Sequence, residues 1–349
     1  MGSIAGNSNQ NDKNIKIQKY VTDKTNGIRK DSKVDVSFDN ILNDITSPQD
    51  INIGSNGRVY ITGRNFEQND KFLLANCKIS NDGDAFEACS VQQLNDVPSN
   101  TRDGNSLIKN GYLYIKAHER NDITMCPITK SDGLIKGCKT NSNSIFNNSS
   151  VSGAVAYLSE ANDNLLLSIK KGDVYSIAQM ELPNYLSIEN APMVNLKEVQ
   201  KINASESPSY ESGILHFKKG NLDQFIQRHS NKLILVRPDV SPAQGTKRDI
   251  VTTNKGDLSD IFSGLYGHIK YNKLDGNIYM TGGIDENSSM KKFAQCNFDW
   301  ISKLNNDPVK TDIEQNCKAL TKDDNNATEN LVDYNNNQRF ISVAFYDKK

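Results

Sequence analysis

Two pairs of cysteines repeat one spacing, and each pair surrounds a predicted tight turn. Cys77 and Cys89 lie twelve positions apart, as do Cys126 and Cys138, and an Asp-Gly step sits near the middle of each interval. Asp-Gly between two strand-forming segments is a strong hairpin signal, and residues equidistant from a hairpin turn face each other. We therefore expect each pair to meet across its own hairpin and to form a disulfide.

A third pair, Cys296 and Cys317, repeats the arrangement with a longer tip around residues 305–308. Six cysteines allow many connectivities, and symmetry about the predicted turns selects this one. Free buried thiols are the alternative. A metal site would need Cys-x-x-Cys or a nearby His, and the sequence has no such spacing. Disulfides persist in oxidising compartments, so we expect an exported protein, periplasmic, at the cell surface or secreted.

Five segments share a pattern in which Gly is followed by alternating apolar and aromatic residues. Period-2 alternation with β-branched and aromatic residues after a turn Gly is typical of a β-strand. Strands that recur at intervals of 42 to 63 residues fit four-stranded propeller blades with loop insertions of varying length. The pattern therefore predicts an all-β repeat protein, a β-propeller. The opening glycines are Gly57, Gly111, Gly153, Gly213 and Gly276.

The two chain ends each contain a strand that could close such a ring. Residues 339–346 are typical of a terminal strand, and residues 33–38 alternate between apolar and polar side chains; we expect the two segments to complete a composite blade. The prediction is about six blades of four strands, with five or seven as alternatives. Residues 1–14 are expected to be flexible and 15–349 to form a single propeller domain. A solenoid or sandwich would instead leave the ends unpaired.

Two of the strands contain a further motif. Residues 60–62, Tyr-Ile-Thr, and residues 279–281, Tyr-Met-Thr, resemble the core of the YVTN-type β-propeller repeat. The hairpins that begin at Cys77 and Cys126 are similar to a cysteine-bearing variant of that blade. The resemblance covers residues 57–140 and 276–318. It implies a propeller of the kind found in exported and effector proteins of intracellular bacterial pathogens, and hence a virulence-associated role.

Charge and hydropathy limit the classes of partner. Lys and Arg number 41 against 42 Asp and Glu, and the two signs are interspersed along the chain. No global field therefore attracts nucleic acid or an anionic membrane. No stretch approaches the roughly 20 apolar residues of a transmembrane helix. We expect no nucleic-acid partner, no transmembrane segment and a monomer.

Candidate catalytic groups are few. No Gly-x-Ser-x-Gly elbow and no phosphate-binding Gly loop occurs, so the sequence alone assigns no catalytic or cofactor-binding residue. Acidic groups at Asp82/Asp84, Asp122 and Asp323/Asp324 invite a calcium interpretation, but turn chemistry explains them as well. The four histidines are His118, His216, His229 and His268. We expect packing or solvation for His118, which ends a strand, and for His216, which replaces a repeat tyrosine.

Two functions remain in view. The first is a non-enzymatic binding scaffold, exported, that engages a protein partner through its loop faces and needs no cofactor. The alternative is a lactonase-like hydrolase with a divalent metal, Ca²⁺ or Zn²⁺, in the central channel. The alternative requires Asp, Glu, Asn or His side chains from several blades to converge there. The metal ligands, if any, are unknown from the sequence.

Overall fold

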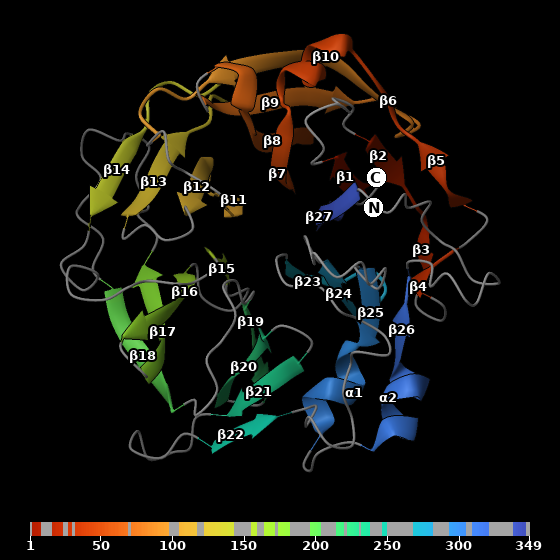
Figure 1. Cartoon of the computed structure of the whole chain (residues 1–349), viewed down its shortest axis with the longest axis vertical. Coiled ribbons are helices and arrows are strands. Elements are labelled where there is room, and N and C mark those ends of the chain that lie inside the picture. Colours follow the sequence, from red (N-terminus) through yellow and green to blue (C-terminus); the bar gives the residue numbers. More distant parts are fainter. Residues whose placement is uncertain are drawn as a thin grey trace.

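Antiparallel sheets follow one another around a ring, each with one edge near the centre and the other at the periphery (Figure 1). Six of the sheets have four or five strands and each forms one blade, which confirms the predicted β-propeller. The computed structural model describes residues 2–7, 16–23, 27–29, 32–68, 71–97, 105–116, 122–142, 155–158, 164–171, 174–181, 196–203, 214–219, 222–229, 232–237, 246–249, 268–281, 293–304, 309–320 and 338–346.

The blades are numbered 1 to 6 around the ring, and their strands are given from the centre outwards. Blade 1 contains β27 (Gln338–Ala344), β1 (Gly2–Asn7), β2 (Lys16–Lys19) and β5 (Val34–Asp35). Blade 2 contains β7 (Ser47–Ile53), β8 (Arg58–Asn65), β9 (Lys71–Ile79), β10 (Ala85–Gln93) and β6 (Ser37–Phe38). Blade 3 contains β11 (Asn105–Lys109), β12 (Tyr112–Lys116), β13 (Asp122–Pro127) and β14 (Lys139–Ser142).

The remaining blades keep the same order. Blade 4 contains β15 (Val155–Leu158), β16 (Asn164–Lys171), β17 (Val174–Glu181) and β18 (Leu196–Asn203). Blade 5 contains β19 (Ile214–Lys219), β20 (Leu222–His229), β21 (Lys232–Arg237) and β22 (Thr246–Asp249). Blade 6 contains β23 (Ile269–Asn272), β24 (Asn277–Thr281), β25 (Phe293–Asn297) and β26 (Cys317–Ala319).

Short elements connect the blades. A two-stranded ribbon, β3 (Thr22–Asp23) and β4 (Gly27–Ile28), separates β2 from β5 in the chain. Two 3-10 helices lie in the segments before β7 and β9: η2 (Asn40–Asp44) and η3 (Phe66–Gln68). Among the described residues, no helix has the length and apolar character that a membrane span requires.

The ring closes through the two chain ends. The C-terminal strand β27 is the innermost strand of blade 1 and pairs antiparallel with β1, in the register Gly2 to Ala344. β2 pairs in turn with β1 and β5. Strands from both chain ends therefore share one blade. Of the segment 33–38, expected to be one strand of that blade, only β5 belongs to it, and β6 pairs with β10 of blade 2. Of the segment 1–14, expected to be flexible, the structure describes residues 2–7, as a strand. The assignment of 15–349 to a single domain stays a prediction.

Apolar residues pack between neighbouring blades. Adjacent residues of β8 show why both faces of each sheet are buried: Val59 joins a cluster with Ile17 of blade 1, and Tyr60 joins one with Leu113 of blade 3. Because side chains alternate across a strand, this period-2 pattern supplies a core on each side of the blade. The repeat tyrosines Tyr60, Tyr114 and Tyr279 are all fully buried.

Each predicted cysteine pair is a disulfide within one blade. Two of the bonds join the third and fourth strands, and the bond of blade 3 joins β13 to Cys138, directly before β14. The register between β9 and β10 shifts between Glu87 and Ser90. This shift shows that β10 has one extra residue at the point where Cys89 comes opposite Cys77. Ala88 lies in this bulge with a φ of 46°. In blade 3, Gly137 precedes the second cysteine with a φ of 75°. A left-handed residue therefore comes before the second cysteine in both hairpins.

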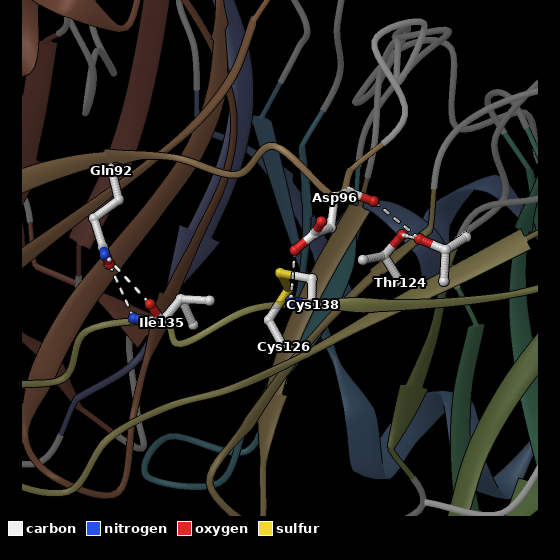
Figure 2. Close-up of a disulfide and its surroundings, with 7 residues drawn as sticks. Gln92, Asp96, Thr124, Cys126, Ile135 and Cys138 are labelled. Carbon is white, nitrogen blue, oxygen red and sulfur yellow. Dashed lines mark hydrogen bonds between the residues drawn. A yellow bond between two sulfur atoms is a disulfide. The ribbon is translucent and has the colours of Figure 1, made fainter. Parts of the chain in front are cut away.

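Figure 2 shows that the disulfide-bonded hairpin of blade 3 also contacts blade 2. The backbone N–H of Cys138 donates to the Asp96 carboxylate at 3.0 Å, and the Gln92 side chain accepts from the N–H of Ile135 at 2.9 Å. The hydroxyl of Thr140 donates to the backbone carbonyl of Asp96 at 3.1 Å. Because these bonds start from the segment around Cys138, the disulfide holds both a hairpin and an interface between blades.

The tips of two hairpins reach back to the preceding blade. Gly83, at the tip of blade 2, faces Tyr346 of blade 1, and Gly133, at the tip of blade 3, faces Tyr60 of blade 2. Both glycines have a positive φ, 77° and 74°. The aspartate before each glycine, Asp82 or Asp132, accepts the N–H two residues on, at 3.0 Å. This Asx turn explains Asp82 without calcium.

The third hairpin is more elaborate than the predicted turn. Two short helices, α1 (Phe298–Lys303) and α2 (Lys310–Asn316), lie between β25 and β26, and residues 305–308 are outside the described part. Asn297 caps α1 by accepting the N–H of Trp300 at 2.9 Å. Ile301 and Ile313 are buried against blade 6. Cys296 and Cys317 remain in direct register below this insertion.

Gly133→Ala is predicted to destabilise the protein more than Gly111→Ala. Both glycines have a similar positive φ, 74° and 78°, so the two substitutions carry similar backbone strain. A Cβ at position 133 would lie 2.6 Å from the Tyr60 hydroxyl, whereas one at position 111 meets nothing within 4 Å. Overpacking adds about 1–3 kcal/mol to the first variant only. Urea unfolding of both measures the difference, and equal losses would contradict the contact between blades.

Candidate functional site

Polar side chains from four of the six innermost strands meet near the ring centre, where Figure 1 places β7, β11, β23 and β27. Asp50 comes from β7, Ser106 from β11, Lys270 from β23 and Ser342 from β27, and His268 lies directly before β23. From blade 1 to blade 6 the innermost strand of each blade contacts that of the next, and β24 contacts β27 at the closure. Ring closure is therefore what brings these residues together.

Strand β7 is irregular directly before Asp50. The register between β7 and β8 shifts between Pro48 and Asp50, which marks a bulge directly before the aspartate. Bulges change the direction in which the following side chains point. Asp50 and Asn52 both reach Ser106 of blade 3, while Ile51 packs into the core between blades 1 and 2.

The carboxylate of Asp50 has no exposed surface, and hydrogen-bond donors surround it. Its Oδ1 accepts from the N–H of Ile51 at 2.8 Å, from Lys270 Nζ at 3.1 Å and from the Ser342 hydroxyl. Its Oδ2 accepts from the N–H of Ser106 at 2.9 Å and from the hydroxyl of the same residue at 3.2 Å. These bonds replace the water that an ionised carboxylate loses on burial.

Opposing effects act on the pKa of Asp50. Burial is the largest single cause and raises the pKa. The charges of Lys270 and His268, followed by hydrogen bonds from Ser342 and Ser106, lower it by more, and the resulting pKa is about 2, below the usual 3.8. Asp50 is therefore a carboxylate at neutral pH.

The ammonium of Lys270 donates all three of its N–H groups within this cluster. Nζ lies 3.1 Å from Asp50 Oδ1, 3.1 Å from the carbonyl oxygen of Ile51 and 3.1 Å from the Ser342 hydroxyl. The side chain is 14% exposed. Because an ammonium has three donors, these three acceptors satisfy it completely. Lys270 thus links blade 6 to blade 2 and to the closing strand β27.

His268 is the group in this cluster with the chemistry of proton transfer. Its Nδ1 lies 4.0 Å from Asp50 Oδ1, and the residue is 5% exposed. Its backbone N–H donates to the hydroxyl of Thr281 at 3.0 Å, which fixes the start of β23 on β24. The imidazole therefore lies beside an ionised carboxylate, at a separation longer than a hydrogen bond.

A divalent metal does not fit at this cluster as it stands. Within the described ranges, no group of three or more His, Cys, Asp or Glu side chains is arranged to hold a metal ion. Asp50 supplies the carboxylate of the cluster, and N–H and O–H donors, including an ammonium, occupy both of its oxygens. A cation of charge two would have to displace the ammonium of Lys270 first.

The other candidate residues occupy other places in the chain. His216 lies in β19 opposite Phe225, and His229 is the last residue of β20. Asp122 begins β13. His118, Asp323 and Asp324 lie outside the described residues.

The sequence patterns did not point to His268, Asp50, Lys270 or Ser342. One signal could have found part of the cluster. Asp50 and Lys270 each lie in the strand directly before a Gly-x-x-Tyr segment. That strand is expected to be the innermost of its blade and buried on both faces, so a charged residue in it is unusual.

Comparison with known proteins identifies the fold and no family. No protein-family model matches the chain, and no curated protein sequence matches it. Among solved structures, a protein from Bacteroides fragilis named as a 6-phosphogluconolactonase shares 12% identity and a TM-score of 0.52, over 85% of this chain and 77% of that one. A periplasmic gluconolactonase of Pseudomonas aeruginosa shares 10% identity and a TM-score of 0.43, over 85% and 91%. At these identities the likeness shows the propeller fold alone.

These neighbours correct one expectation. We expected a non-enzymatic binding scaffold, because the sequence has no recognisable catalytic motif. That prediction is contradicted, since a solved structure that shares the propeller fold is named as a 6-phosphogluconolactonase. The residues of the cluster around Asp50 are too far apart in the chain to form a sequence motif.

Asp50→Asn and Lys270→Met are each predicted to destabilise the protein by about 3–5 kcal/mol, because each leaves a buried charge without its partner. The double variant should lose much less than the sum of the two. Urea unfolding of the four proteins measures the coupling. The exposed pair of Asp299 and Lys303 is the control, and breaking it with Asp299→Asn should cost less than about 1 kcal/mol. Additive losses at positions 50 and 270 would contradict the pairing.

Stability is predicted to fall between pH 4 and pH 2 through Asp50. The pKa of this group is about 2 in the folded protein and near 3.8 when exposed, so the folded state favours the ionised form. Its contribution is complete above pH 3.8 and is lost as the pH falls towards 2. Denaturant unfolding at a series of pH values should show a shallower acid loss in Asp50→Asn than in the wild type. Parallel profiles would show that Asp50 has no such role.

Proposed function

We propose that this protein is a lactonase-like hydrolase in which His268 is the general base. The observation that carries the proposal is the imidazole of His268 beside the ionised, fully buried carboxylate of Asp50 at the ring centre. The propeller fold of the Bacteroides fragilis protein supports the choice of lactones as the substrate class to test, because that protein is named as a 6-phosphogluconolactonase.

The reaction needs one water and one base. His268 takes a proton from water while the water oxygen attacks the lactone carbonyl carbon, which forms a tetrahedral intermediate. When the intermediate collapses, the bond between the carbonyl carbon and the ring oxygen breaks. The imidazolium returns its proton to that ring oxygen, and the product is a hydroxy acid. Asp50 stabilises the imidazolium between these two steps and is a positioning residue.

Ser342 is not assigned as a nucleophile. Its hydroxyl proton is donated to Asp50, and its oxygen accepts an N–H of Lys270. A serine nucleophile needs a base that takes its proton, and a carboxylate with a pKa of about 2 is a poor base for that purpose. Lys270 keeps Asp50 ionised and in place, so it too is a positioning residue.

Hydrolysis of glucono-1,5-lactone and of 6-phosphogluconolactone, followed by acid release, tests the proposal. His268→Gln should lower kcat by about 10²–10⁴-fold with a much smaller change in KM, because the base acts in the transition state. Lys303→Gln, on exposed α1, is the control and should keep wild-type kinetics. Wild-type protein that hydrolyses neither lactone, or a His268→Gln variant with full activity, would overturn the proposal.

The finer expectations from the sequence belong with this proposal. We propose that the hydrolase works in an oxidising compartment outside the cytoplasm, and the three disulfides support this. Membership of the YVTN-type repeat is supported by Tyr60 and Tyr279, which occupy equivalent buried positions in β8 and β24. The monomeric state and the virulence-associated role stay predictions.

A further inference from the structure

Three oxygen atoms surround one point at the ring centre. The point is Lys270 Nζ, and the oxygens belong to the Asp50 carboxylate, the Ile51 backbone carbonyl and the Ser342 hydroxyl, each at 3.1 Å. Carboxylate, carbonyl and hydroxyl oxygens are the ligands that hard cations take in proteins. The lysine therefore ends in a cage that has the composition of a metal site.

We propose that the Lys270 ammonium is a built-in cation that occupies this three-oxygen site in place of a free metal ion. The native ring centre then needs no divalent cation and binds none at this position. Removal of the ammonium converts the cage into a site for a free cation. This inference goes beyond the hydrolase proposal and does not depend on His268 acting as a base.

Charge favours the internal cation over a divalent ion. The ammonium balances the single charge of Asp50. A divalent ion beside the same carboxylate would either expel the ammonium or place three positive charges, its own two and that of Lys270, next to one negative charge. The other hydrogen-bond donors to Asp50 are neutral N–H and O–H groups of Ile51, Asn52, Ser106 and Ser342.

The Lys270 ammonium connects separate strands, as a structural metal ion does. Its three ligand atoms come from β7 and β27, and its own chain comes from β23. Lys270 thus joins blades 6, 1 and 2 at the point where the chain ends close the ring. Since the ammonium is covalently attached, this link does not depend on the supply of metal in the compartment.

The residue type is also specific. A lysine ammonium is a compact charge with three donors that can point to three separate oxygens. An arginine places its donors in a planar fork, which matches a single carboxylate and not a cage around one point. We therefore expect Lys270→Arg to be as disruptive as removal of the charge.

Thermal unfolding tests the proposal. Wild-type Tm should be unchanged by excess EDTA and by added Ca²⁺ or Zn²⁺. Lys270→Ala should have a lower Tm that methylammonium or Ca²⁺ raises in a saturable way, because a cation that binds only the folded state stabilises it. Lys270→Met is the matched control, since its side chain fills the space of the lysine stem and leaves no room for an added cation; it should show no such recovery.

The outcomes separate clearly. A wild-type Tm that falls in EDTA or rises saturably with Ca²⁺ or Zn²⁺ would overturn the proposal, as would a folded Lys270→Ala variant that no cation stabilises. If Lys270→Ala is unfolded alone, recovery of its near-ultraviolet circular dichroism with methylammonium supports the cage, and lack of recovery contradicts it. None of these readouts requires lactone hydrolysis, so failure of the hydrolase proposal would leave them unchanged.

Discussion

A carboxylate that has lost all contact with water is stable in its ionised form only if charge and hydrogen bonds replace its hydration. Asp50 meets this condition with donors from its own strand, from β11, from β23 and from β27. The donors come from four blades, so the ionised state of one side chain depends on the correct closure of the ring. The dependence is mutual, because Asp50 and Lys270 also connect the blades on both sides of the closing strand.

The same cluster changes the view of function. A search for motifs in the sequence favours a passive scaffold, since nucleophile elbows and phosphate loops are local patterns. The grouping of His268 with Asp50 is not local and becomes visible only when the strands assemble. Folds of this kind carry many functions, so the proposed chemistry depends on these side chains and not on the propeller itself. We propose that the ammonium of Lys270 takes the place, at this cluster, of the metal that the hydrolase alternative called for.

Around the centre, repeated local devices build the blades. The hairpins of blades 2 and 3 each have an Asx turn, a left-handed tip glycine that faces the preceding blade, and a left-handed residue before the second cysteine. The bulge at Ala88 shows the physical requirement: an extra residue is needed to bring the second cysteine opposite the first. Where the interval is longer, in blade 6, two helices fill it and the cysteines still pair.

The amino-acid sequence alone determined the parts of this protein that depend on short-range pairing. Cysteines 12 or 21 positions apart meet across a hairpin, and Gly followed by alternating apolar residues makes a strand, because turn geometry and side-chain alternation decide both. The tertiary structure alone determined which residues meet at the ring centre. Asp50 contacts Lys270, which is 220 positions away in the chain, and Ser342, which is 292 positions away. Contacts at such separations produce no recognisable spacing in the sequence. Only closure of the ring brings these strands together, since each blade contributes one inner edge to a common axis.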